Sequence, residues 1–243
     1  MNNRRTKMLP KIILGQLFVG LIMACLGFSV LFFAEGYRFN ILNFKIIKTG
    51  VASFSAYPRD SKIYVNDKLL YKGSRFSTSA HSINLTGGYY TARAERDGYV
   101  TWNSSFRIEP GLVSDFGSIV LFKNNIVGET LTDQARINSL NAPVDTLANK
   151  DSSNPISVGS EIWLNNKLVT RFSSPVLNTK WYSDQKHILY QIDDQSRIMD
   201  IDGSNNVLLI TLKTSSSTNY FVNYRGDELY YIDNNEYMMA KIR

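Results

Sequence analysis

The longest pattern in the chain is an uninterrupted apolar segment near its start, which predicts a membrane-spanning helix. Residues 12–34 contain no charged side chain and consist mostly of Leu, Ile, Val, Phe, Met, Ala and Gly. A helix of about 20 such residues crosses the hydrocarbon core of a bilayer and satisfies its own backbone hydrogen bonds there. We therefore expect a transmembrane helix over residues 12–34, preceded by a short tip over residues 1–11.

The charges around this segment predict its orientation. The tip contains no acidic residue and four basic ones, Arg4, Arg5, Lys7 and Lys11. The positive-inside rule places such a tip in the cytoplasm and the rest of the chain on the extracytoplasmic side. A cleavable signal peptide would have a shorter apolar core and a small-residue cleavage site, which Phe32-Phe33-Ala34 does not provide. A lipoprotein signal would end at Cys25, but residues 26–34 stay apolar, so an uncleaved anchor fits better and gives Cys25 no role.

From residue 50 onward the pattern changes to an alternation of apolar and polar positions, which predicts strands. Turn-forming residues separate the alternating segments. The expected strands cover residues 51–57, 62–65, 68–71, 82–85, 89–95, 101–108 and 115–122. No helical period interrupts them. Residues 50–122 are therefore predicted to form a small β-sandwich.

The turns of this region follow a recognisable order. Pro58 ends the first strand, residues 63–68 read Ile-Tyr-Val-Asn-Asp-Lys, and two later turns read Gly-Gly-Tyr-Tyr (87–90) and Asp-Gly-Tyr (97–99). These features resemble the PEGA domain, a small extracytoplasmic β-sandwich module with a Val-Tyr-x-Asp-Gly-Lys hairpin and Gly-Tyr turns. The chain departs from the family where Arg-Asp-Ser (59–61) replaces Glu-Gly-Ala, and where Lys68 stands in place of the hairpin Gly.

The following residues, 123–155, change in composition. Asn, Ser, Thr and Asp dominate, Pro143 and Pro155 occur, and the apolar residues show no sustained period. This composition predicts a long surface linker, with a short degenerate strand around residues 137–140.

The last region, residues 156–243, repeats itself at an offset of 40 residues. Leu-Tyr-Gln-Ile-Asp-Asp at 189–194 recurs as Leu-Tyr-Tyr-Ile-Asp-Asn at 229–234, and Met199 recurs as Met239. At this offset His187 corresponds to Asp227, which makes the histidine a replaceable turn residue. A period near 40 with about four short strands per unit is typical of a β-propeller blade.

Three further segments resemble bacterial propeller repeats. Residues 181–190 are similar to the opening of such a repeat, residues 202–205 to its Asp-Gly-Ser-Asn hairpin, and residues 161–164 to the third strand of a preceding, incomplete blade. Two blades and part of a third are fewer than the four that a closed propeller typically needs. Three arrangements are open: the sandwich and linker cover the free edges, a second copy completes the ring as a homo-oligomer, or the repeats form an open meander sheet.

Composition excludes several classes of protein. A hydrophobic content of 44% excludes a wholly disordered chain, and a single Cys excludes an internal disulfide and a zinc–thiolate cluster. The net charge of +6 and the pI near 9.3 invite a nucleic-acid function. However, four of the 27 basic residues precede the span, and the 23 that remain face 21 acidic residues, a net of +2. The basic balance is therefore mainly a topology signal, and no nucleic-acid partner is expected.

Few residues suggest a site. Asp200, Asp202 and Asn205 have a calcium-like spacing, but the twelfth position of such a loop is Thr211, so an ordinary turn explains them as well. Tyr99 and Trp102 are candidates for stacking on a carbohydrate, although aromatic residues in a small sandwich usually pack in its core. The sequence gives no cofactor site and no metal site beyond this weak calcium pattern.

These observations lead to an expected function without catalysis. The chain is predicted to be a single-pass, membrane-anchored scaffold or interaction protein of the bacterial cell envelope, with the lipid bilayer and an envelope protein or polysaccharide as partners. The alternative is a hydrolase-like envelope enzyme, or a subunit of one, with a site at a blade interface. That alternative requires Asp193, Asp194, Asp200 and Asp202 to share one pocket. A sensor is disfavoured because an eleven-residue tip cannot house a signalling domain.

Overall fold

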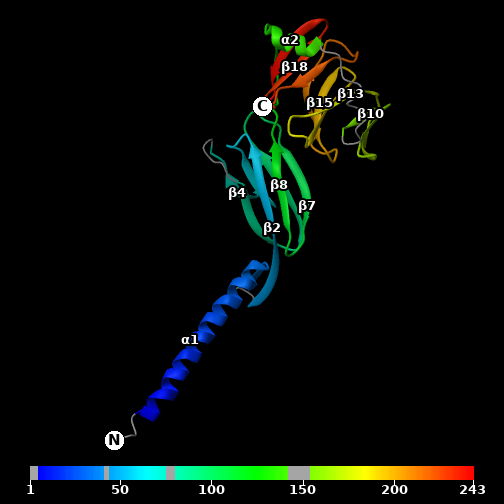
Figure 1. Ribbon diagram of the computed structural model, residues 1–243. Helices are drawn as coiled ribbons and strands as arrows, with labels where there is room; N and C mark the ends of the chain where they lie inside the picture. The colour runs from blue at the N-terminus through cyan, green and yellow to red at the C-terminus, as the bar shows by residue number, and fades with distance from the viewer. Residues whose placement is uncertain (1–4, 41–43, 75–79, 142–153) are drawn as a thin grey trace. The chain divides into compact units, whose positions relative to one another are not determined.

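The computed structural model describes residues 5–40, 44–74, 80–141 and 154–243, and Figure 1 shows them as ribbons. These residues form nineteen strands and two helices. The first helix is the apolar one, and every strand follows it in the sequence. The expected fold class, a β-rich region behind one apolar N-terminal helix, is therefore confirmed. Residues 1–4 of the predicted tip, Arg4 among them, lie outside the described residues.

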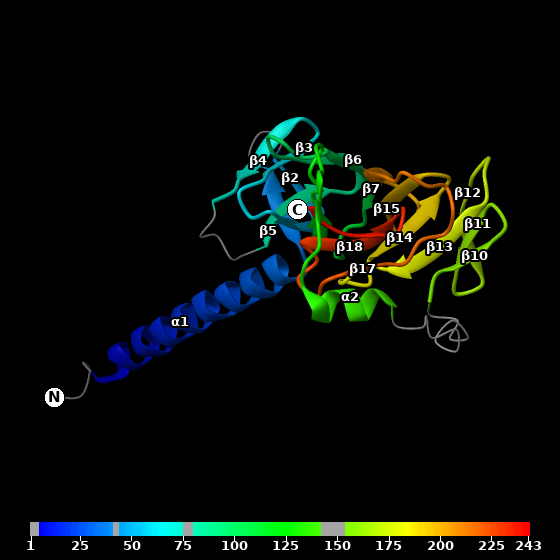
Figure 2. The same ribbon diagram turned by 90° about the horizontal axis from the view of Figure 1, so that it is seen from above.

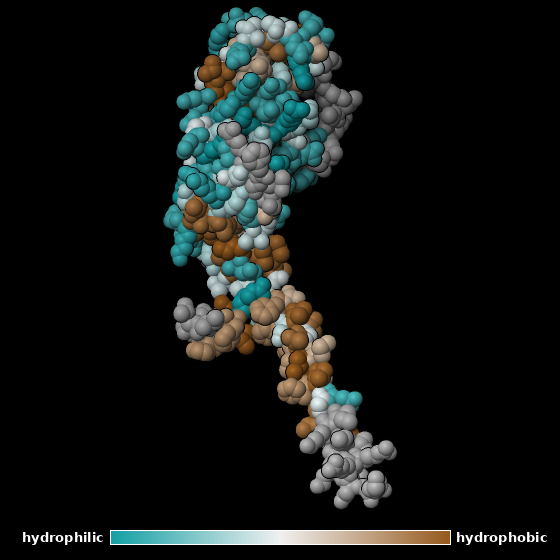
Figure 3. All heavy atoms as spheres, turned by 90° about the vertical axis from the view of Figure 1, so that its left-hand side faces the viewer, coloured by the Kyte–Doolittle hydropathy of each residue, from teal (hydrophilic) through white to brown (hydrophobic). Residues whose placement is uncertain are grey.

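Helix α1 (Arg5–Ala34) contains the predicted span. Its segment Ile13–Ala34 is long and apolar enough to cross a membrane, and its side chains are almost all exposed. Figure 3 shows this apolar surface along the helix. The hydroxyl of Ser29 donates to the carbonyl of Cys25 at 2.7 Å, so this polar side chain is satisfied within the helix, as a lipid environment requires.

The chain divides into two compact units. The first contains residues 1–53, 82–90 and 107–115, and the second contains residues 54–81, 91–106 and 116–243. In the first unit, α1 turns into strand β1 (Tyr37–Asn40) at Gly36, whose φ is +85°. A Cβ atom there would lie 2.7 Å from the carbonyl oxygen of Thr49, so the turn requires glycine.

Two four-stranded sheets make up the sandwich region. One of them contains β5 (His81–Thr86), β2 (Lys45–Tyr57) and β8 (Val113–Val120), with β1 paired to β2. The other runs in the order β4 (Lys68–Lys72), β3 (Lys62–Val65), β6 (Gly88–Glu95) and β7 (Trp102–Ile108). Phe54 is fully buried and packs against the rings of Phe106 and Phe116, at centroid distances of 5.9 and 5.0 Å. These aromatic contacts form the core that the alternating pattern predicted.

Strand β2 starts six residues before the predicted strand over 51–57. Its first part, residues 45–48, pairs with β1, a strand that the sequence did not predict. Pairing with a neighbour, rather than burial of an alternate face, makes this segment extended, because its residues are mostly exposed. The hydrophobic pattern therefore does not reveal it.

Three antiparallel sheets follow. The first sheet contains β10 (Ile156–Val158), β11 (Glu161–Leu164) and β12 (Lys167–Arg171). The middle sheet contains β13 (Val176–Trp181), β14 (His187–Ile192), β15 (Gln195–Asp200) and β16 (Val207–Thr211). The last sheet contains β17 (Tyr220–Val222), β18 (Glu228–Asp233), β19 (Glu236–Lys241) and β9 (Gly128–Thr130). Figure 2 shows the three sheets side by side, with the first sheet (β10 to β12) at the right-hand end.

The segment predicted as a linker contains structured elements. Strand β9 pairs with β19, and residues 134–141 form helix α2 (Gln134–Asn141) where a short strand was expected around 137–140. The carboxylate of Asp133 caps this helix by accepting from the amide of Ala135 at 2.9 Å. Ile137 and Leu140, three positions apart, then share one helical face and pack on the last sheet. The expected strand is therefore wrong, and Pro143 lies outside the described residues.

The repeat has an offset of 41 residues rather than 40. His187 pairs with Asp200 at one end of β14, and Glu228 pairs with Lys241 at the same position of β18. The burial of side chains agrees with an offset of 41. Tyr190 packs against the sheet that precedes its own, and Tyr231, 41 positions later, likewise packs against the preceding, middle sheet. A slip of one residue moves every side chain to the opposite face of a strand. The matches at offset 40, including Met199 with Met239 and His187 with Asp227, are therefore wrong.

Strand β11 is the second strand of its sheet rather than the third. The two-residue turn Asn165-Asn166 follows it, as Asp193-Asp194 follows β14 and Asn234-Asn235 follows β18. Strands β10, β11 and β12 of the first sheet therefore correspond to β13, β14 and β15 of the middle sheet, and the first sheet has no described counterpart of β16.

The end of the sandwich enters the core between the middle and last sheets. Val120 and Phe122 pack there with Leu189 and Leu229. The amide of Lys123 then donates to the carbonyl of Ile242 at 3.0 Å. Of the three open arrangements, this contact corresponds to the one in which the sandwich covers part of the repeats.

Candidate functional site

The candidate interaction site is the first sheet, which has an unpaired outer edge in the part of the chain that the structure describes. In the other two sheets the equivalent edge carries a fourth strand, β16 on β15 and β9 on β19. The β9 strand is notable because it comes from a segment more than a hundred residues before β19 in the sequence. A remote segment can therefore complete a sheet of this kind.

The local sequence explains why β12 has no neighbour on its outer side. Asn165 and Asn166 have φ values of 51° and 59°, which a two-residue hairpin turn requires and which Asn tolerates. This turn aligns β12 with β11. Residues 172–175 alone then separate β12 from β13, and so short a connection leaves no room for another strand.

The two faces of the first sheet differ. Ile162 is fully buried against Val176, Ile188 and other residues of the middle sheet. On the opposite face, cross-strand pairing aligns Ile156, Trp163 and Leu168. Ile156 and Leu168 are 37% and 38% exposed. An apolar row therefore lies beside the free edge.

Charged residues frame this row. Glu161 accepts from Trp163 Nε1 at 2.8 Å and from Arg171 Nε at 2.7 Å. These hydrogen bonds hold the pKa of the Glu161 carboxyl below its usual value. At the other end of β12, Lys167 is exposed. The strand itself, Lys-Leu-Val-Thr-Arg, has a basic residue at each end and no acid.

A second polar cluster surrounds His187 at the start of β14. The imidazole is 3% exposed, and its Nδ1 and Nε2 lie 2.7 Å from Asp184 Oδ2 and 3.2 Å from Asp200 Oδ1. Burial lowers the pKa of His187, but the two carboxylates outweigh burial and raise it to about 9. The other oxygen of Asp200 accepts from Trp102 Nε1 at 2.9 Å. The cluster therefore ties the middle sheet to β7 of the sandwich.

The calcium-like residues belong to this cluster and its turn. Asp202 Oδ1 accepts from the amide of Ser204 at 2.9 Å, and Asn205 makes two hydrogen bonds of 3.0 Å with the backbone of Asn103. Asp200 is held by His187 and Trp102, as described. Within the described residues, no group of three or more His, Cys, Asp or Glu side chains has the geometry to hold a metal ion.

The two aromatic candidates have different environments. Trp102 is 8% exposed and packs on Phe116 at a centroid distance of 6.5 Å, so its ring faces the core. Tyr99 is half-buried, and the guanidinium of Arg96 lies over its ring at 4.6 Å. Trp102 contributes its indole N–H to the His187 cluster rather than a surface for a ligand.

The four aspartates of the enzyme alternative do not share a pocket. Asp193 and Asp194 form the turn before β15, whereas Asp200 and Asp202 lie at the far end of this strand. A strand of six residues spans about 17–20 Å, so the two pairs lie far apart.

Sequence reasoning missed both the β12 edge and the role of His187. The short spacing after Arg171 would have indicated the edge. The Asp184-x-x-His187 spacing would have indicated the first ion pair, although nothing local points to Asp200 or Trp102.

No family model matches the chain, and no curated protein matches it.

Proposed function

We propose that the chain is a non-enzymatic, single-pass membrane protein of the bacterial cell envelope that binds an extended segment of a partner protein at the β12 edge. The missing fourth strand of the first sheet carries the binding proposal. The apolar helix α1 supports the membrane anchor, and the basic residues before its apolar segment support a cytoplasmic N-terminus. The PEGA-like sandwich and propeller-like repeats then stand outside the membrane.

The chemistry of β12 defines the partner segment. Addition of a strand to a free edge uses backbone hydrogen bonds for affinity and alternate side chains for specificity. The amide of Phe172 donates to Ser160, so the alternation of an antiparallel ladder points the amide of the preceding Arg171 away from β11. No described strand lies on that side of β12, so this amide is positioned to bond an incoming strand. The basic ends of β12 favour a strand with apolar or β-branched residues at its centre and acidic residues at its ends.

Charge argues against a second copy as the occupant. If β12 paired with itself in antiparallel register around Val169, Lys167 of one copy would face Arg171 of the other. Like charges directly opposite each other destabilise a strand pair. Lysine on an edge is also a common device against such self-association. A partner strand with acidic ends is therefore favoured over a dimer.

Deletion of residues 1–35 is expected to move the protein from the membrane fraction to the soluble fraction. The deleted segment contains all the long apolar surface of α1, whereas the remaining sheets bury their own cores. Fractionation of cells with alkaline washing measures the change. Protease treatment of intact cells tests the orientation. If only the first residues were removed, the N-terminus would lie outside the cell, contrary to the proposal. A deletion variant that stays in the membrane fraction after the alkaline wash would contradict the anchor.

A synthetic peptide with alternating Val and Thr and a Glu at each end is expected to bind the full chain in detergent, with contacts at β12. The variant Arg171→Pro removes the outward amide and the charge, and we expect about ten-fold weaker binding. Arg171→Gln keeps the outward amide but removes the charge and the ion pair with Glu161, and we expect about a three-fold loss. NMR shifts or calorimetry measure the binding.

The matched control for this experiment is Arg197→Gln. Arg197 lies on β15, whose outer edge is already occupied by β16. Its substitution should leave peptide binding unchanged. A peptide that binds Arg171→Pro as tightly as the natural chain would disprove the edge as the docking site, as would equal binding of a peptide with Lys at both ends.

A further inference from the structure

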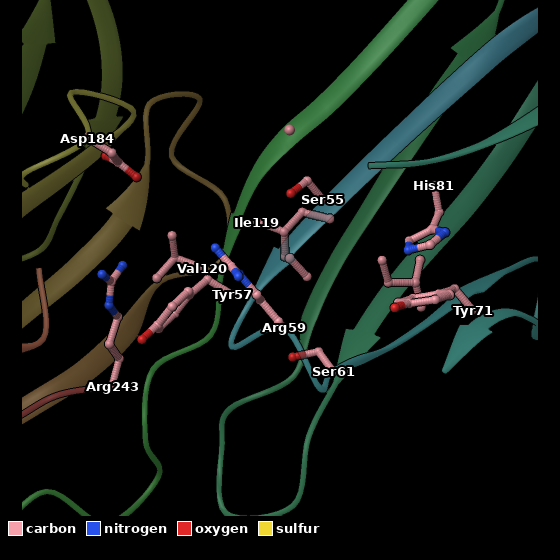
Figure 4. A pocket seen from close by; sticks show the side chains of 13 residues that line it. Ser55, Tyr57, Arg59, Ser61, Tyr71, His81, Ile119, Val120, Asp184 and Arg243 are labelled. Atoms are coloured by element: carbon pink, nitrogen blue, oxygen red, sulfur yellow. The ribbon is translucent and has the colours of Figure 1, made fainter. Parts of the chain in front are cut away.

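A cavity of about 320 Å³ lies next to the ends of β2 and β8, apart from the β12 edge. All of its lining residues belong to the second compact unit. Figure 4 shows Tyr57, Arg59, Arg243 and Val120 close together, with Ile119 beside Arg59.

The two arginines give the cavity excess positive charge. Among the described residues, neither Arg59 nor Arg243 forms an ion pair with a carboxylate. The guanidinium of Arg243 lies over the ring of Tyr57 at 4.0 Å, which fixes its position. One of its terminal nitrogens donates to the carbonyl of Arg225, but its Nε is buried without a hydrogen-bond partner. A ligand acceptor would satisfy this donor.

The single acidic residue that lines the cavity does not cancel this charge. Asp184 accepts from the imidazole of His187 at 2.7 Å and from the amide of Lys186 at 2.8 Å. The imidazole and this amide therefore already compensate its charge. A second donor is available across the cavity, where His81 stacks on Tyr71 at a centroid distance of 3.3 Å and keeps a buried Nε2 without a partner.

We infer that this cavity binds the carboxylate of a compact organic anion. Guanidinium groups match carboxylates in geometry and form charge-assisted hydrogen bonds with them. Arg59 and Arg243 would hold the carboxylate, the imidazole of His81 would bond a polar group at the other end, and Ile119 and Val120 would contact the body of the ligand. An acidic sugar and an acidic amino acid share this chemistry. The inference concerns a site of its own and does not depend on the β12 edge or the membrane anchor.

Titration of the full chain in detergent with small carboxylates tests the site. The probes are sodium glucuronate and N-acetylglutamate, with methyl glucoside as an uncharged control and sodium sulfate as a control for simple ion binding. We expect saturable binding of at least one carboxylate, and about ten-fold weaker binding in Arg59→Gln and in Arg243→Gln. Preference for glucuronate identifies a sugar site, and preference for N-acetylglutamate identifies a site for an acidic amino acid.

The control variant is Arg107→Gln, whose guanidinium lies over Tyr89 in the other compact unit. It should bind the probes as the natural chain does. Because Arg243 also contacts Tyr57, its variant is checked for an unchanged unfolding temperature. Arg59 is exposed and has no such structural contact among the described residues, so its variant keeps the test decisive. The inference is overturned if neither carboxylate saturates, if methyl glucoside or sulfate binds equally well, or if Arg59→Gln binds like the natural chain.

Discussion

Replacement of His187 with Ala is expected to lower the free energy of unfolding by about 3–5 kcal/mol. The imidazole lies between two carboxylates that are themselves largely buried, with Asp184 and Asp200 side chains 26% and 19% exposed. Without the imidazolium, both carboxylates lose the positive partner that offsets their burial. The loss of one partner of a buried ion pair is more costly than the pair itself is stabilising. Denaturant unfolding of the detergent-solubilised chain measures the change.

The same cluster predicts a pH dependence of stability. The pKa of His187 is raised from 6.5 to about 9 in the folded protein, because the carboxylates outweigh burial. A group whose pKa is raised on folding contributes stability that is fully present below its unfolded pKa and is lost as pH rises through its folded pKa. We therefore expect the natural chain to lose about 3 kcal/mol between pH 6.5 and 9 that His187→Ala does not lose.

His81→Ala is the control for both measurements. His81 is half-buried and stacks on Tyr71, and it lies outside the cluster. We expect its substitution to cost about 1 kcal/mol and the variant to keep the loss of stability that His187 causes between pH 6.5 and 9. If His187→Ala and the natural chain had parallel pH profiles, the charge of His187 would not contribute to stability.

The hydrophobic pattern predicts the elements that bury one face. Strands β6 and β7 of the sandwich alternate clearly, and their predicted positions differ from the observed ones only at the first residue. The repeat register fails for the opposite reason. In β14 the residues from His187 to Gln191 are all buried, because neighbouring sheets cover both faces. No alternation remains to distinguish an offset of 40 from one of 41.

The candidate site depends on contacts that are remote in sequence. The bond from Trp102 to Asp200 joins residues 98 positions apart, and β9 joins β19 across a similar distance. Neither contact has a local signal. The free edge of β12 is partly local, because the turn at Asn165-Asn166 and the short connection after Arg171 can be read directly. What makes the edge significant is the comparison with β16 and β9, which only the folded structure provides.

The second large effect is expected for Phe122→Ala, which should lower the free energy of unfolding by about 3–5 kcal/mol. Phe122 is 3% exposed, and its ring packs edge-on against Tyr182 and His187 at centroid distances of 5.5 and 5.9 Å. Truncation leaves a cavity in the core that the middle and last sheets share. The control is Phe39→Ala, at a residue that is 54% exposed, with an expected cost of about 1 kcal/mol or less.

The position of Phe122 also predicts that the second compact unit unfolds in one step. The amide of Leu121 donates to the carbonyl of Tyr57 at 2.8 Å, and the carbonyl of Phe122 accepts from the amide of Val100 at 2.8 Å. The segment that fills the core between the sheets is therefore bonded to the sandwich on both sides. Unfolding of either the sandwich strands or the repeat sheets exposes this core to water. Because that exposure costs free energy, the two regions are expected to unfold together.

Native-state hydrogen exchange, measured at β3 in the sandwich and at β14 in the middle sheet, tests this coupling. In the natural chain the most protected amides of both strands are expected to exchange with the same free energy, because they open together. Phe122→Ala should lower both values by the same amount. If protection fell at β14 and stayed unchanged at β3, the sandwich would fold on its own. The sheets would then be a separate module that Phe122 merely touches.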